Sequence, residues 1–116
     1  MIREVRFSYD FQRAFKRLKK RYRTLPSDLK QMLLSLAANP LQGAELYDGM
    51  RKVRINITSK SKGKSGGGRV IIRLTVNETC LSFLYIYDKS DMANVSEGYL
   101  DEIILEVDRG YYLTKL

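Results

Sequence analysis

The sequence contains no histidine and only one cysteine, Cys80, among its 116 residues. Without histidine, the protein cannot use an imidazole acid-base pair or a cysteine-histidine nucleophile, and it cannot build a zinc site from nitrogen and sulfur ligands. One cysteine cannot close an internal disulfide, and its place in an apolar run predicts a small buried side chain. These two scarcities exclude most familiar hydrolase chemistries.

Long apolar runs are also missing. No stretch of 18 apolar residues occurs, and the first residues do not combine a charged segment with an apolar one. We therefore expect a cytoplasmic protein without membrane contact. A chain of this length can close one hydrophobic core but hardly two, so residues 1–116 are expected to form a single domain.

Acidic residues are few, at 13 against 21 lysines and arginines, which leaves a formal net charge of +8 and a pI near 9.7. Such an excess of positive charge favours a polyanionic partner, with nucleic acid first among the candidates. Residues 49–77 hold eight bases and no acid, whereas residues 78–116 hold eight acids and three bases. The distribution predicts one strongly positive surface and another that is acidic or mixed.

Hydrophobic periodicity predicts the order of the elements. It indicates an edge strand at 2–7, helices at 11–22 and 29–37, strands at 52–57, 69–76 and 81–87, and a helix at 97–107. This order predicts an α+β fold, with a small antiparallel twisted sheet, two N-terminal helices and a C-terminal helix, the helices packed on one face. In the last strand, alternation places Phe83, Tyr85 and Tyr87 together on one side.

The same alternation predicts a surface that combines cations with phenol rings. It assigns side-chain positions facing away from the helices to Lys52, Arg54, Arg69, Arg73, Tyr85 and Tyr87. Cations can pair with RNA phosphates while aromatic rings stack on bases, which suits binding of a single strand. The alternative is that each arginine is a solvated charge and that the tyrosines are aromatics at the edge of the core.

Residues 58–69 join two predicted strands and are rich in glycine and lysine. Lys60, Lys62 and Lys64, together with glycine amides, would suit phosphate groups; a solvated hairpin loop is the alternative. Gly63-Lys64-Ser65 resembles the end of a nucleotide-binding P-loop, but Thr58 stands where the first glycine should be, and a strand follows instead of a helix. We therefore expect no ATP or GTP site.

Carboxylates near the end of the chain offer little for metal chemistry. Asp88, Asp91, Asp101 and Glu102 are interpreted as a solvated face, so no metal ligands are assigned. What remains for RNA cleavage is attack of a 2'-hydroxyl on its own phosphate, with lysine and arginine stabilising charge and tyrosine or lysine moving protons. This chemistry needs no cofactor.

Five segments carry a family resemblance: FQRAFKRLKK at 11–20, Asn39-Pro40 with Gly43, GMRKVR at 49–54, SKSKGKSGGGRV at 59–70 and IYDKS at 86–90. They resemble the RelE/ParE superfamily of type II toxin-antitoxin toxins, and in particular its RelE and HigB-like branch. The resemblance implies a RelE-like fold of the microbial-ribonuclease type and an mRNA interferase, an endoribonuclease that acts at the ribosomal decoding site and inhibits translation. It also implies a cognate antitoxin protein as partner, besides the ribosome and mRNA.

The resemblance places Lys52, Arg54, Arg69 and Lys89 at positions that contact the scissile phosphate. Tyr87 is the candidate general acid, with Lys89 as the second candidate; Lys60, Lys62, Lys64, Arg73 and Tyr85 complete the expected RNA-binding set. The alternative functions are a ParE-like inhibitor of DNA gyrase and a non-catalytic basic RNA-binding module. An inactive or differently targeted relative is a further alternative.

Overall fold

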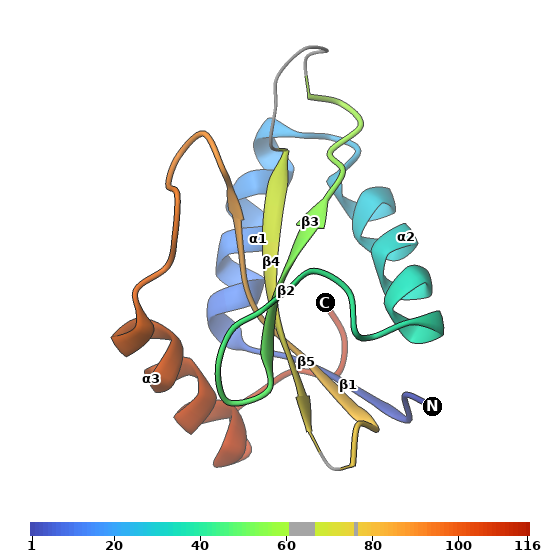
Figure 1. The fold of residues 1–116 in the computed structure, drawn as a ribbon. Coiled ribbons are helices and arrows are strands. Elements are labelled where there is room, and N and C mark those ends of the chain that lie inside the picture. The colour runs from blue at the N-terminus through green and yellow to red at the C-terminus, as the bar shows by residue number, and fades with distance from the viewer. Residues whose placement is uncertain (61–66, 76) are drawn as a thin grey trace.

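Five strands form one sheet in the order β1-β5-β4-β3-β2 in the computed structural model, which describes residues 1–60, 67–75 and 77–116 (Figure 1). The strands are β1 (Glu4–Phe7), β2 (Ala44–Glu45), β3 (Met50–Ile55), β4 (Gly68–Thr75) and β5 (Cys80–Asp88). β3, β4 and β5 pair antiparallel, as their alternating patterns predict. β1 lies at the edge of the sheet, as predicted, but it pairs with β5 in parallel, so the sheet is mixed.

In the part of the chain that the structure describes, three helices accompany the sheet and confirm the predicted α+β class: α1 (Tyr9–Arg21), α2 (Leu25–Ala38) and α3 (Glu97–Asp108). Ser8 caps α1, because its hydroxyl accepts from the Phe11 amide at 2.9 Å and donates to the Leu84 carbonyl at 2.6 Å. Ser96 caps α3, because its hydroxyl accepts from the Tyr99 amide. No helix within the described residues is long and apolar enough to cross a bilayer.

The helices lie on both faces of the sheet, so the expectation that they share one face is wrong. The core on one face joins α1 and α2 to strand residues such as Val53 and Val70, and the core on the other joins α3 to Met50 and Ile71. Figure 1 shows α3 apart from the other two helices. Ile71, an apolar residue on the otherwise polar side of β4, is apolar because α3 covers it. Cys80 is buried, as predicted.

β5 carries a bulge that changes which residues share a face. Ile71 pairs with Tyr85, but Ile72 pairs with Phe83, so Leu84 is an extra residue in the strand. Phe83 therefore packs on the α1 side, its ring 5.2 Å from that of Phe7. The expectation that it shares a face with Tyr85 and Tyr87 is wrong, because both tyrosines lie beyond the bulge.

Candidate functional site

Three of the predicted site residues form a row across the sheet. Arg54 on β3 is opposite Arg69 on β4, and Arg69 is opposite Tyr87 on β5. All three lie on the face that carries α3, since their neighbours Val53, Val70 and Ile86 pack in the core beneath α1 and α2. Because adjacent strands are about 5 Å apart, the row gathers two guanidinium-bearing residues and a phenol at one end of the sheet.

The Tyr87 phenol is well placed to keep its proton. Only 3% of the residue is exposed, and its hydroxyl donates to the Ala93 carbonyl at 3.3 Å. Burial raises the pKa of Tyr87, and the positive charge of Arg69 offsets this only in part. The phenol is therefore protonated at neutral pH, which is the form that a general acid requires.

A cavity of about 390 Å³ lies beside this row, between the sheet and the chain that leads into α3. Ile71 and Leu100 give it an apolar floor, and Tyr47 and Tyr87 contribute rings. At its border, Lys52 Nζ donates to Asn94 Oδ1 at 2.8 Å. Lys52 thus lies next to the Arg54, Arg69 and Tyr87 row, whereas Asn94 is a polar neighbour that the sequence analysis did not identify.

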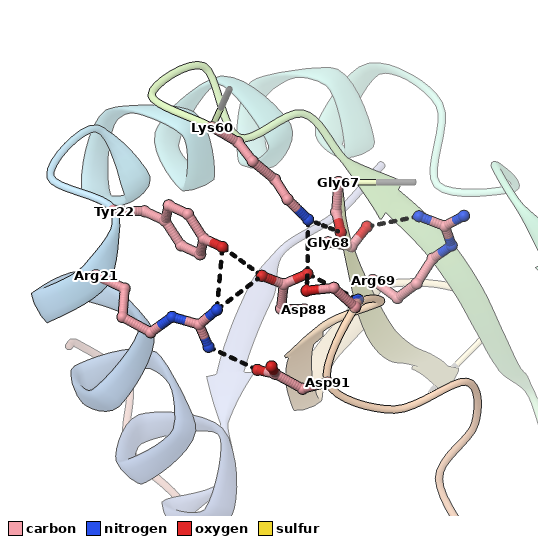
Figure 2. Close-up of polar contacts among 9 residues, drawn as sticks. Arg21, Tyr22, Lys60, Gly67, Gly68, Arg69, Asp88 and Asp91 are labelled. Carbon is pink, nitrogen blue, oxygen red and sulfur yellow. Dashed lines mark hydrogen bonds and ion pairs between the residues drawn. The ribbon is translucent and has the colours of Figure 1, made fainter. Parts of the chain in front are cut away.

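Asp88 is a buried carboxylate at the end of β5, and the expectation that it belongs to a solvated face is wrong. It is 0% exposed and is held by Lys60 Nζ at 2.7 Å, Ser90 Oγ at 2.8 Å and Arg21 at 3.4 Å, with the Tyr22 hydroxyl also donating to it (Figure 2). We call these five residues the Asp88 cluster. It joins the end of α1, the chain after β3 and the end of β5.

The ionisation of Asp88 follows from this setting. Burial by itself would raise the pKa of Asp88, but hydrogen bonds from Lys60, Tyr22 and Ser90 outweigh that effect and hold the pKa well below its usual range. The carboxylate is therefore charged over the physiological range. The sequence contains one signal for such a role, because Asp88 is the last residue of a strand whose other residues are nearly all apolar.

The remaining predicted residues occupy different surroundings. Lys89 is exposed, and its amide donates to the Gly67 carbonyl at 3.2 Å. The Lys60 side chain is only 11% exposed, and it forms an ion pair with Asp88. Lys62 and Lys64 lie outside the described residues.

Two predicted RNA-binding residues on the α3 face are engaged by protein groups. Arg73 lies at the other end of β4 from Arg69, paired with Asp48 at 3.2 Å and with Asp108 at 3.0 Å. The ring of Tyr85 packs edge-on against that of Tyr99, with 5.5 Å between centroids. Arg73 is therefore not brought into the row, whereas Tyr85 borders it.

Metal ligands are not grouped in the part of the chain that the structure describes. No set of three or more histidine, cysteine, aspartate or glutamate side chains there is arranged to hold an ion. Asp88, the most buried of the C-terminal acids, has Lys60, Tyr22 and Ser90 as its partners. The arrangement is suited to holding an anion near arginines and to transferring a proton from a phenol.

Comparison with known proteins identifies one family and two related structures. The family model described as the RelE toxin of the RelE/RelB toxin-antitoxin system matches residues 11–106. A chain in the crystal structure of the RelBE2 toxin-antitoxin complex from Mycobacterium tuberculosis has a TM-score of 0.53 and 17% identity, over 76% of this chain and 99% of that one. The free Escherichia coli toxin RelE, as a mutant with two arginines replaced by alanine, has a TM-score of 0.57 and 13% identity, over 92% and 99%.

The search of curated proteins found no match. At 17% and 13% identity, the two structures show a shared fold and nothing finer. The family match rests on sequence and spans most of the chain.

Proposed function

The chain belongs to the RelE toxin family of toxin-antitoxin systems, and on that basis we propose that it is a ribosome-dependent endoribonuclease that cleaves mRNA and so inhibits translation. The observation that carries the proposal is the row of Arg54, Arg69 and Tyr87 across three neighbouring strands. Two cations beside a protonated phenol match what metal-free cleavage of a phosphodiester needs.

In the proposed reaction, the 2'-hydroxyl of the bound RNA attacks the adjacent phosphorus, and the bond to the 5'-oxygen of the next nucleotide breaks. Arg54 and Arg69 stabilise the negative charge that develops on the phosphate oxygens, with Lys52 and Lys89 adding to the positive field. The 2'-hydroxyl proton passes to water, and Tyr87 donates its proton to the departing 5'-oxygen. Tyr87 then regains a proton from water, so the protons balance over the reaction. The products are a 2',3'-cyclic phosphate and a free 5'-hydroxyl, and no cofactor takes part.

The partners follow from the same proposal. α1 carries exposed bases along its outer side, namely Arg13, Lys16, Arg17, Lys19 and Lys20. We assign this surface to ribosomal RNA near the decoding site, so the protein acts in the cytoplasm, where translation occurs. Because a related structure is a toxin-antitoxin complex, we also expect a cognate antitoxin to bind and silence the protein.

The test is inducible expression in bacteria with mapping of mRNA 5' ends, followed by cleavage assays on purified mRNA with and without ribosomes. We expect cuts within codons that require ribosomes. Replacing Arg69 with alanine should lower the cleavage rate by about 10² to 10³, the usual cost of removing one group that stabilises developing charge. Arg109→Ala, which removes the same charge from the exposed end of α3, is the matched control.

Three results would contradict the proposal in different ways. Cleavage by Arg69→Ala at the wild-type rate would show that the active site is not at the row of Arg54, Arg69 and Tyr87. Inhibition of gyrase supercoiling without RNA cuts would favour a ParE-like activity. Salt-sensitive RNA binding without products would favour a non-catalytic RNA-binding module.

A further inference from the structure

Among the lysines that the structure describes, Lys60 is unusual because its charged end is enclosed by protein. The side chain is 11% exposed, and its ammonium lies 2.7 Å from Asp88 Oδ1 and 3.5 Å from the Gly67 carbonyl oxygen. A lysine buried to this degree normally has a specific partner. Here the partner is a fully buried carboxylate, so binding an RNA phosphate would require Lys60 to leave it.

The residues just before Lys60 are also tightly held. Asp28 accepts from the Thr58 amide and from the Thr58 hydroxyl, each at 3.0 Å, and Thr24 Oγ1 accepts from the Ser59 amide at 2.9 Å. Thr58 and Ser59 are therefore fixed against the start of α2.

Gly67, the next residue that the structure describes after Lys60, is fixed near the Lys60 ammonium. The Gly67 carbonyl accepts from the Lys89 amide at 3.2 Å. The same oxygen lies 3.5 Å from Lys60 Nζ (Figure 2). Gly68 is paired with Asp88 in the sheet, one register position before Arg69 and Tyr87. Gly68 is also closely packed, since a Cβ there would lie 2.8 Å from Ile55 Cγ2 and 3.2 Å from the Tyr87 carbonyl oxygen.

We propose that Lys60 and Asp88 are positioning residues whose ion pair holds the ends of β4 and β5 together and thereby sets Arg69 against Tyr87. This proposal rests on the RNA-cleaving function proposed above. In it, Lys60 makes no contact with RNA phosphate. Its contribution is to the geometry of the neighbouring row, where a misplacement of about 1 Å can cost about 10² in rate.

Two lysine variants distinguish positioning from phosphate contact. Lys60→Met removes the charge but keeps much of the apolar stem, and Lys60→Arg keeps a positive charge that can still reach Asp88. Lys30→Met is the control, because Lys30 is an exposed lysine on α2 outside the proposed site. Each protein is assayed for ribosome-dependent cleavage and for the dependence of RNA affinity on salt concentration.

We expect Lys60→Met to lower kcat by about 10- to 100-fold, up to the cost of a misplacement of about 1 Å, and Lys60→Arg to recover most of that loss. For Lys60→Met, the slope of log RNA affinity against log salt concentration should match that of Lys30→Met, because neither lysine contacts an RNA phosphate. The proposal would be overturned if kcat were unchanged and the salt dependence of Lys60→Met were weaker than that of Lys30→Met by the amount expected for one lost phosphate contact.

Amide hydrogen exchange provides a readout that does not depend on cleavage. In Lys60→Met, the Lys89 amide should exchange faster than in the wild type, whereas the Phe7 amide, bonded to the Leu113 carbonyl at 2.8 Å, should not change. Unchanged exchange at Lys89 would overturn the positioning role. If the wild-type protein does not cleave RNA, the proposed function fails, and the exchange and salt measurements still decide what Lys60 does.

Discussion

Replacing Asp88 with asparagine should be among the most destabilising conservative changes in this chain. Asp88 is fully buried and accepts from Lys60, Tyr22, Arg21 and Ser90. Asparagine keeps the shape and one acceptor oxygen, but it turns an amide nitrogen toward donors and leaves the Lys60 ammonium without a counter-charge. Removing one partner of a buried ion pair costs about 3–5 kcal/mol. Because Arg21 is 48% exposed and Lys60 has a flexible stem, we expect about 3 kcal/mol.

The assay is urea denaturation at pH 7, with Asp91→Asn as the control. Asp91 also pairs with Arg21, at 2.7 Å, but is 47% exposed, so its loss should cost less than about 1 kcal/mol. Asp88→Asn should lower the free energy of unfolding with little change in the m-value. A cost for Asp88→Asn no larger than that for Asp91→Asn would refute the reasoning.

The same comparison has a pH dependence of known sign. The pKa of Asp88 is lowered in the folded protein from 3.8, so the stabilisation is fully present above about pH 4 and is lost as pH falls. The difference between wild type and Asp88→Asn should shrink as pH falls below 3.8, by at most about 1.4 kcal/mol per pH unit. A difference that stays constant from pH 5 to pH 2.5 would show that the charge of Asp88 is not the cause.

Three further substitutions test other parts of the structure. Tyr87→Phe should slow single-turnover RNA cleavage by about 10² to 10⁴ if the phenol is the general acid, while the lost bond to the Ala93 carbonyl should cost only about 1 kcal/mol in unfolding; an unimpaired cleavage rate would exclude this role. Arg73→Ala should leave the salt dependence of RNA binding unchanged, because protein carboxylates already hold that guanidinium; a shallower slope would contradict this. Ser8→Ala should cost about 1–2 kcal/mol in thermal unfolding, since it removes the cap of α1; a change below about 0.3 kcal/mol would refute the capping role.

Much of the fold was predictable because the strands that build the sheet are each half buried. Alternation along β3 and β4 requires Val53 and Val70 to face the α1 side, and this places Arg54 and Arg69 on the other face. The face chosen by α3 was not predictable in this way. An amphipathic helix shows that it has an apolar side, but not which side of the sheet that side will cover.

The bulge and the Asp88 cluster escaped prediction for a different reason. A bulge depends on packing across the sheet, and nothing in the residues around Leu84 indicates that one of them is unpaired. Asp88 and Lys60 are 28 residues apart, so local composition cannot show that they meet. The sequence could identify the candidate cations, but only the three-dimensional arrangement distinguishes a lysine facing solvent from one enclosed beside a carboxylate.

The extra residue in β5 matters for anyone who transfers segments between members of this family. Residues of β5 before Leu84 pair with both β1 and β4, whereas residues after it pair with β4 alone, in a register shifted by one residue. Deleting or adding one residue between Leu84 and Tyr87 would turn the phenol toward α1 and bring an aliphatic side chain to the opposite surface. Chimeras should therefore be aligned from the bulge toward the end of β5. A graft aligned only from Cys80 would exchange the two faces of the strand after Leu84.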